Sequence, residues 1–530
     1  MVGPLHRGRH DSLTMADEEK SRRSLRVFDL FFLLLAASPL ILPFIMVEQP
    51  EPPAGTHSES DWFSVMESDV ELLIDSTAWD PLKKRRVIKQ EIFDELLDMI
   101  ARADKFIVID FFLWNHFQGT VVEDYRKLST ELAFALVQKK KANPNLPIVV
   151  LTDPINRIYG EMAPAFFKEM ESVGVKVVFT HLWSLPDSNW IYGTNARFYS
   201  RFAPNPNKPT AFVNRPLIPN PLIIDGPKIS MKQLGHLLFF KANHRKVAIT
   251  ASHNEGVDLL VSSLNPADGS SAHSNMGVRI RGGLGLEALK SELELITWSF
   301  EASSEQTLPV EIDRIQSLAG GMRGNTRRGD VRVKWITEGA IRSHLIEMLE
   351  GAESGDEVMI ALFYLSDRNV IAAIKQAAKN GAKVRMVLDS NRDAFGREKN
   401  GIPNRIVVRE FEELAVEQNI GIVWADTHGE QFHDKVLGIF NPFSGKNQLC
   451  LGSANWTRRN LADLNLEANV RVENSETSMA RFKAHFEALW SNSGDLSYTL
   501  DYASWAETGW RATAKAWLYR FQEWSGLGTF

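Results

Sequence analysis

The chain has 530 residues, of which 44% are hydrophobic and 24% charged, an ordinary globular composition that excludes a disordered or fibrous protein. This length exceeds what one hydrophobic core supports, so we expect two domains with appended segments. The net charge of -6 argues against a dedicated nucleic-acid binder, because such proteins carry an excess of basic residues that neutralise phosphates. The single cysteine, Cys450, excludes an internal disulfide and a cysteine-based zinc site.

The first predicted element is a membrane-spanning helix at Val27–Val47. This apolar stretch is 21 residues long and has one charge, Asp29. As a helix it would measure roughly 31 Å, about the hydrocarbon thickness of a bilayer. Basic residues precede it, and the residues that follow are acidic, with no lysine or arginine before Lys83. The positive-inside rule therefore predicts a single-pass protein with residues 1–26 in the cytosol and the remainder exported, on the periplasmic or extracytoplasmic side.

Two other interpretations of this segment stay open. A cleaved signal peptide would need a small-residue cleavage site, and Ala36-Ala37-Ser38 is a poor one. A buried core helix would not require the charge asymmetry of the flanks.

Two halves of the chain repeat the same order of patterns. A helix pattern leads into the apolar run Phe106–Trp114 in the first half and into Val358–Ser366 in the second. Downstream, Pro147–Gly160 matches Lys383–Gly396, because each is a buried-strand pattern that ends in Asp and continues with Asn-Arg and an aromatic-Gly pair. Two matches in the same order indicate an internal duplication.

We therefore expect two lobes of alternating strands and helices. The predicted boundaries are 66–300 for lobe 1, 301–330 for a linker rich in Ser, Gly and charge, 331–495 for lobe 2 and 496–530 for a C-terminal helix. Lobe 1 holds a Pro- and Asn-rich insertion at residues 189–230. Such an insertion is either a lid or substrate loop, or a passive surface excursion.

Each half also carries a His-x-Lys motif followed by serine and asparagine at matching distances. The first copy consists of His244, Lys246, Ser263, Asn265 and Asn275, and the second of His433, Lys435, Ser453, Asn455 and Asn465. The separation from histidine to the first asparagine is 21 residues in one copy and 22 in the other. Of the 13 histidines, only His244 and His433 are followed by lysine two positions later. Two copies in a duplicated frame predict one composite site.

This set of residues predicts chemistry on a phosphodiester. Residues two apart on a strand share a face, so each histidine points with its lysine. If the halves meet face to face, two imidazoles and two ammonium groups surround one anion, with asparagine amides at the edge of the pocket. One imidazole can attack phosphorus and the other can protonate the departing alkoxide, and water or an alcohol then displaces the phosphohistidine. With two lysines present, no metal ion or other cofactor is required.

The elements H-x-K, G-S-x-N and N-x-E resemble those of the phospholipase D superfamily, in particular its cardiolipin synthase-like branch. They are His433-Asp434-Lys435, Gly452-Ser453-Ala454-Asn455 and Asn465-Leu466-Glu467. The resemblance implies an α/β fold of two pseudo-symmetric lobes, each a mixed β-sheet flanked by helices, with the active site at the lobe interface. It also implies that His244 is the nucleophile, that His433 is the acid and base, and that Glu467 accepts a hydrogen bond from an imidazole Nδ1–H. The order of the two histidines stays open, because the sequence alone does not break the symmetry.

The chain departs from the family pattern at several positions. The usual aspartate five residues after the lysine is Ala251 in the first half and Phe440 in the second. The sequence alignment places Gly277 where the second half has Glu467, and Ser262 where it has Gly452. A degenerate, inactive first lobe is therefore an alternative.

Other residues near the motifs are expected to have structural roles. Asp153 and Asp389 end predicted strands and are expected to cap turns. His253 and His273 are expected in surface positions or loops.

A phospholipid is the predicted substrate, because the chain has a membrane segment, an acidic balance and no conspicuous basic tract. A C-terminal stripe of Trp510, Ala514, Trp517, Phe521 and Trp524 also suits a bilayer interface, although such a helix can pack on its own domain. We therefore expect a membrane-anchored phosphodiesterase or phosphatidyltransferase, with Ser263, Ser453, Asn275 and Asn465 contacting the substrate. A nuclease with the same pocket and a defunct binder of anionic headgroups are the alternatives.

Overall fold

The computed structural model describes residues 41–45, 50–53, 55–117, 124–160, 162, 164–200, 214–221, 227–302, 308–322, 329–394, 397–412 and 419–528. Of the predicted membrane segment Val27–Val47, residues 41–45 are included and are helical, and the rest lies outside the described residues. Within the described part of the chain, no helix combines the length and apolar character needed to cross a bilayer.

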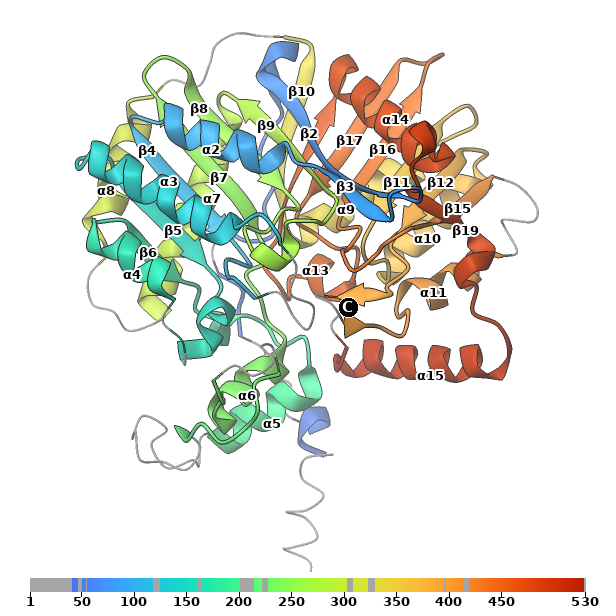
Figure 1. Cartoon of the computed structure of the whole chain (residues 1–530), viewed down its shortest axis with the longest axis horizontal. Helices are drawn as coiled ribbons and strands as arrows, with labels where there is room; N and C mark the ends of the chain where they lie inside the picture. Colours follow the sequence, from blue (N-terminus) through green and yellow to red (C-terminus); the bar gives the residue numbers. More distant parts are fainter. Residues whose placement is uncertain are drawn as a thin grey trace, which may run out of the picture.

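Two mixed β-sheets organise the molecule, one in each lobe (Figure 1). The strands of lobe 1 are β2 (Val70–Asp80), β3 (Arg85–Lys89), β4 (Phe106–Phe111), β5 (Ile148–Thr152), β6 (Lys176–Phe179), β7 (Lys246–Ser252), β8 (Gly256–Ser262) and β9 (Asn275–Arg281). The strands of lobe 2 are β1 (Phe63–Val65), β10 (Val331–Thr337), β11 (Glu357–Leu362), β12 (Lys383–Leu388), β15 (Ile420–Ala425), β16 (Lys435–Asn441), β17 (Lys446–Gly452), β18 (Ala468–Glu473) and β19 (Thr499–Asp501).

The two sheets repeat each other strand for strand. The order β2-β9-β8-β7-β4-β5-β6 in lobe 1 corresponds to β10-β18-β17-β16-β11-β12-β15 in lobe 2. In both, the last three strands are parallel and the others pair antiparallel. The lobe 1 sheet has one additional edge strand, β3, and the lobe 2 sheet has two, β1 and β19. The predicted α/β class with two pseudo-symmetric mixed sheets is confirmed.

Helices cover both faces of each sheet, which explains why the central strands are continuous apolar runs. Helices α2 (Ile92–Arg102), α3 (Leu128–Ala142) and α4 (Ala165–Ser172) pack on the outer face of lobe 1. Helices α9 (Glu338–Glu350), α10 (Arg368–Lys379) and α11 (Asn404–Val407) cover the outer face of lobe 2. The Asp367 side chain caps α10 by accepting hydrogen bonds from the first free backbone N–H groups.

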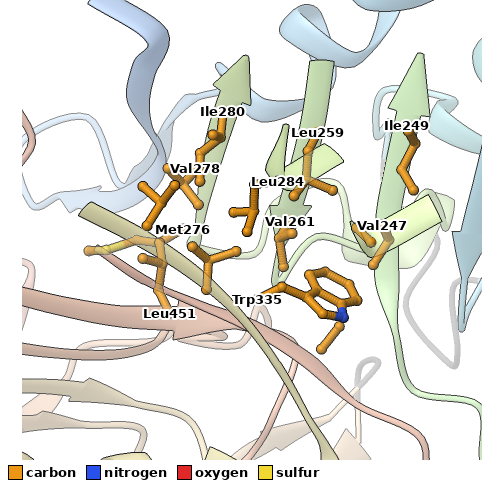
Figure 2. Packing of buried hydrophobic residues seen from close by; sticks show 14 of the residues in the cluster. Val247, Ile249, Leu259, Val261, Met276, Val278, Ile280, Leu284, Trp335 and Leu451 are labelled. Carbon is orange, nitrogen blue, oxygen red and sulfur yellow. The ribbon is translucent and has the colours of Figure 1, made fainter. Parts of the chain in front are cut away.

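The inner faces of both sheets share one hydrophobic core with α7 (Leu284–Ala302), α8 (Val310–Gly320) and α14 (Glu476–Ser491). Figure 2 shows Val261 and Met276 of lobe 1 beside Trp335 and Leu451 of lobe 2. Strands β8 and β9 contact β17 across this junction. The core that joins the lobes therefore also fixes the relative position of the strand ends that carry the two motifs.

Three segments differ from the sequence-based expectation. The predicted linker at 301–330 contains α8, whose Ile312 and Ile315 are buried in the shared core. The predicted insertion at 189–230 includes helix α5 (Trp190–Ser200). The predicted C-terminal helix begins later than residue 496, because residues Thr499–Asp501 form edge strand β19 and α15 spans Gly509–Ser525.

One end of the molecule gathers the elements around the motifs. Helix α13 (Arg458–Leu461) lies between the lobes, and α5, α6 (Met231–Phe239) and α15 lie below them in the view of Figure 1. A short hairpin of β13 (Asp393–Ala394) and β14 (Arg397–Glu398) belongs to lobe 2.

Candidate active site

Backbone hydrogen bonds join the two lobes directly beside both histidines. The N–H of His244 donates to the carbonyl oxygen of Leu466 at 2.9 Å, and the N–H of His433 donates to that of Ser274 at 3.0 Å. Each contact belongs to a parallel β-bridge between lobes, Asn243 with Leu466 and Ser274 with Phe432. Both motifs are therefore fixed at one junction by the backbone of the opposite lobe.

Each imidazole also receives a side-chain partner from the opposite lobe. Nδ1 of His244 lies 2.7 Å from Oε1 of Glu467, and Nδ1 of His433 lies 3.1 Å from Oδ1 of Asn275. Both partners accept at these atoms, so each imidazole carries its proton on Nδ1 and leaves Nε2 for chemistry. In the described part of the chain, the side-chain hydrogen bonds of both rings are made at Nδ1, and neither Nε2 has a partner.

The sheet register shows that Asn275 is the counterpart of Glu467, which corrects the sequence alignment. Ser263 Oγ donates to Asn275 Oδ1 at 3.0 Å, and Ser453 Oγ makes the same bond to Glu467 Oε2. Gly277 corresponds instead to Asn469, since Gly277 pairs with Ser262 as Asn469 pairs with Gly452, and it lies two residues beyond the counterpart of Glu467. The first lobe thus retains an orienting residue, an amide in place of a carboxylate.

Ser263 and Ser453, which were predicted to contact the substrate, instead hydrogen-bond to the residues that orient the histidines. Ser263 and Ser453 are fully buried, and each hydroxyl also accepts a backbone N–H, from Met276 and Ala468 respectively. They hold the acceptors of the imidazoles in place. Asn275 is also buried, and its amide nitrogen donates to His273 O at 3.1 Å. We therefore describe Ser263, Ser453 and Asn275 as positioning residues.

The two lysines lie beside their histidines, as the spacing predicts. Nζ of Lys246 donates to the carbonyl oxygen of His244, and Nζ of Lys435 to that of His433, both at 2.7 Å. Both side chains are buried. Each ammonium keeps further N–H groups that an anion between the lobes can accept.

A pair of phenylalanines that sequence reasoning missed completes the symmetry. The ring centroid of Phe112 lies 4.8 Å from that of His244 and 5.4 Å from Nζ of Lys246. Phe363 has the same relation to the second motif, 5.1 Å from the ring of His433 and 5.3 Å from Nζ of Lys435. Both follow directly after the first parallel strand of their lobe, β4 or β11. Because Phe112 and Phe363 occupy the same position in the two repeats, a comparison of the two halves of the sequence could have identified them.

Burial disfavours the cationic form of all four groups. It lowers the pKa of His244 to about 4, against the opposing attraction of the Glu467 carboxylate. Burial and the nearby Lys435 ammonium lower the pKa of His433 well below its usual range. Burial lowers the pKa of Lys246 to about 7, and burial and Lys246 lower the pKa of Lys435 strongly. An anion placed among these groups would restore their charge, so the site favours an anionic ligand.

Both imidazoles line one pocket of about 490 Å³ between the lobes. Asn265, Asn455 and Asn465 also line it, as predicted for residues at its edge. Oδ1 of Asn265 accepts the N–H of Leu113 and Oδ1 of Asn465 accepts that of Ala242. Oδ1 of Asn455 is buried and has no hydrogen-bond partner among the described residues.

The aspartates at the strand ends cap turns and also support the motifs. Asp153 accepts the N–H of Ile155 and, through its other oxygen, the N–H of Asn243 at 2.9 Å. Asp389 likewise accepts the N–H of Asn391 and that of Phe432 at 2.8 Å. Each aspartate therefore holds the residue that precedes a motif histidine.

The two additional histidines differ in exposure. His253 is exposed and lies 3.3 Å from Asp104, as expected of a surface residue. His273 lies in the loop before β9, as expected, but it is buried, with its ring centroid 5.8 Å from that of His433. Burial lowers the pKa of His273 to about 3, so the ring is neutral beside His433.

Arg245, the middle residue of the first motif, carries a buried ion network. It is fully buried and donates to Glu338 at 2.7 Å and to Glu292 at 3.1 Å. We expect Arg245→Met to destabilise the fold by about 3–5 kcal/mol, because two buried carboxylates lose their cation. Lys290→Met, which removes an exposed ion pair, should cost at most about 1 kcal/mol. Urea denaturation measures both, and equal effects would contradict the network.

The lobe 2 residue at the same motif position is Asp434, which is also buried. Neither carboxyl oxygen has a hydrogen-bond partner among the described residues. Burial raises its pKa to about 8, so the group is protonated at neutral pH. The middle positions of the two motifs therefore break the symmetry of the site.

The asymmetry between Glu467 and Asn275 predicts a pH effect. Only a neutral imidazole is nucleophilic, so if His244 is the attacking group, kcat/KM should rise with pH through its pKa of about 4. Glu467→Gln removes the negative charge that raises the pKa of His244. The rise of kcat/KM with pH (the acid limb of the profile) should therefore move to lower pH, while kcat falls about 10²-fold. Glu476→Gln, at the exposed start of α14, is the control. A loss of activity with an unmoved acid limb would point to misfolding.

No group of three or more His, Cys, Asp or Glu side chains arranged to hold a metal ion occurs in the ranges that the structure describes.

Comparisons with known proteins support the architecture. Residues 345–490 match the family model described as cardiolipin synthase, PLD-like domain. A comparison with curated protein sequences finds no match. The fold is similar to that of phosphatidylserine synthase from Haemophilus influenzae Rd KW20, with 12% identity over 88% of this chain and 95% of that chain and a TM-score of 0.51.

Two further solved structures align with parts of the chain. The phospholipase D family member Nuc from Salmonella typhimurium is 18% identical over 33% of this chain and 99% of its own, with a TM-score of 0.25. Yeast tyrosyl-DNA phosphodiesterase is 11% identical over 76% of this chain and 88% of its own, with a TM-score of 0.40.

The family match covers the second motif, including His433, Lys435, Asn455 and Glu467. The two-lobed fold extends over most of the chain and brings the first motif to the same pocket. Residues 345–490 thus match a PLD-like domain, and the two-lobed fold of the chain is similar to that of phosphatidylserine synthase.

Proposed function

We propose that the chain is a phospholipase D-type phosphodiesterase or phosphatidyltransferase that acts on phospholipids through a phosphohistidine. The observation that carries this proposal is the convergence of His244 and His433, from different lobes, on one pocket. Each has its Nδ1 engaged by the opposite lobe, so that Nε2 is the reactive atom.

In the first proposed step, Nε2 of His244 attacks phosphorus and the bond from phosphorus to the leaving oxygen breaks. A proton on Nε2 of His433 passes to that oxygen. In the second step, His433 takes the proton of water or an alcohol, whose oxygen attacks phosphorus, and the P–N bond breaks. Lys246 and Lys435 stabilise the charge on the non-bridging oxygens in both steps.

The charges support this division of roles. Glu467 is a carboxylate, so it stabilises the positive charge that the His244 ring gains when it is phosphorylated. His433 faces the neutral amide of Asn275 and must alternate between protonated and neutral forms. A bound phosphodiester anion raises the lowered pKa of His433 toward neutrality, which supplies the acid only when substrate is present.

The shape of the pocket supports a lipid substrate. One wall is apolar and is formed by Leu234, Leu237 and Leu238 of α6, with Phe240 beyond its end. His244 and His433 line the same pocket. A phosphodiester with an apolar substituent fits such a site.

We also propose that Val27–Val47 anchors the chain in a membrane with the lobes on the exported side. The length, apolar character and flanking charges of this sequence support the assignment. The anchor would keep the pocket close to its lipid substrate.

A lipid panel tests the proposed function. The full chain, reconstituted in detergent, is incubated with phospholipids of different headgroups, with and without glycerol or phosphatidylglycerol as acceptor. Release of headgroup or formation of a transfer product supports the proposal. Cleavage of DNA in the presence of EDTA without action on any lipid would favour a nuclease instead.

A further inference from the structure

Helix α15 turns its aromatic stripe away from the protein. Trp510 is 76% exposed and Trp517 is 75% exposed, and Phe521 also faces outward. The opposite face of the helix, with Ala512 and Tyr519, is buried against lobe 2. The buried face therefore attaches the helix to its lobe, and the aromatic stripe is not needed for this packing. A row of large exposed aromatic side chains marks an interaction surface.

A chain of aromatic contacts links this helix to the start of the described chain. The ring of Phe44 lies 5.2 Å from that of Trp190, and the ring of Trp190 lies 5.4 Å from that of Trp524. Nε1 of Trp190 also donates to the carbonyl oxygen of Trp524 at 2.9 Å. The end of the predicted membrane segment Val27–Val47 thus meets α15 and α5 at one end of the molecule (Figure 1).

The same end contains the mouth of the active-site pocket. Leu238 of α6 lines the pocket and is also exposed at the surface, as is Met231 at the start of that helix. Tyr192 of α5 donates its hydroxyl to the carbonyl oxygen of Gly235, which ties α6 to α5. An apolar path therefore runs from the exposed surface to the apolar wall of the pocket.

Two of the three cations beside the stripe are paired within the protein. Lys515 lies 2.6 Å from Glu507, and Arg520 lies 2.9 Å from Glu410. The third, Arg511, is exposed, and its guanidinium lies 5.6 Å from the centroid of the Trp510 ring. An apolar face with tryptophans and one flanking arginine fits the interfacial region of a bilayer, where indole rings reside.

We propose that a docking face formed by Phe44, Leu238, Trp510, Trp517, Phe521 and Trp524 lies on a lipid bilayer and places the pocket mouth at its surface. This inference rests on the proposed function in one respect, because it supplies the route by which a bilayer lipid reaches the histidines. The face itself would bind lipid whether or not the site is active.

A fluorescent label reports the docking directly. Cys450 is buried, so a cysteine introduced at an exposed position is labelled selectively. The full chain with Ala514→Cys, on the stripe of α15, is labelled and reconstituted into phosphatidylcholine vesicles that contain acyl-chain nitroxide lipids. Phe443→Cys is the control, because Phe443 is 93% exposed in the turn after β16, and β16, roughly 20 Å long, separates it from the motif of His433.

The proposal expects strong quenching of the label at position 514 and none at position 443. Absence of quenching at 514, or equal quenching at both positions, would overturn the docking face. This result does not depend on catalysis, so an inactive protein with quenching at 514 would refute the proposed function alone.

A surface variant tests the link to activity. Trp510→Ser, Trp517→Ser and Phe521→Ser combined should lower turnover of vesicle phospholipid roughly tenfold or more, because bilayer contact is lost. Turnover of a short-chain, monomeric phosphodiester should stay within about twofold, because the pocket is unchanged. An unchanged rate on vesicles, or an equal loss on both substrates, would contradict the proposed seating of the pocket.

Discussion

His244→Ala is expected to abolish turnover of every phosphodiester, with kcat lower by about 10⁴-fold or more, because the proposed nucleophile is removed. The backbone N–H of residue 244 still reaches Leu466, so the junction between the lobes should persist. Headgroup release and transfer to an alcohol should fall together, since both pass through one intermediate. Initial rates on a lipid and on a p-nitrophenyl phosphodiester measure the effect.

His253→Ala is the matched control for this variant. His253 follows β7 in the same lobe but is exposed and lies beside Asp104, away from the pocket. Its activity should equal that of the unmodified chain. Residual activity of His244→Ala above about 10⁻² of the normal rate would argue against a covalent role for this ring.

His433→Ala is expected to give a different defect, which separates the roles of the two rings. On a phospholipid, kcat should fall by about 10³-fold or more, because the alkoxide must leave without a proton. On a p-nitrophenyl phosphodiester, whose leaving group needs no acid, one equivalent of p-nitrophenol should be released in a burst. Turnover should then stop, because no base activates water for the second step.

A stopped-flow trace of p-nitrophenol release checks this expectation. The burst amplitude should equal the enzyme concentration for His433→Ala and should be zero for His244→Ala. A burst in His244→Ala and none in His433→Ala would reverse the assignment of nucleophile and acid. No burst in either variant would contradict sequential use of the two rings.

The duplication and the paired motifs could be predicted from the sequence, because strand periodicity and the His-x-Lys spacing are local. The correspondence of orienting residues could not. Ser263 and Asn275 are 12 residues apart, whereas Ser453 and Glu467 are 14 apart. Lobe 2 includes α13 in this interval, so a fixed offset misaligns the two copies. The strand register, not the spacing, decides which residue faces each imidazole.

The cross-lobe contacts could not be predicted for a related reason. Leu466 and Ser274 support the histidines through backbone atoms, which leave no trace in residue type. The exposure of Trp517 depends on which face of α15 the lobe covers, and an amphipathic pattern alone allows either orientation.

Trapping the covalent intermediate tests the central claim most directly. The full chain and its His433→Ala variant are mixed with a phospholipid labelled at phosphorus, denatured in alkali, digested, and analysed by mass spectrometry. We predict a phosphorylated peptide that contains His244, more abundant in His433→Ala and absent from His244→Ala. Active turnover of the lipid with no labelled histidine in either protein, or with the label on another residue, would contradict the account.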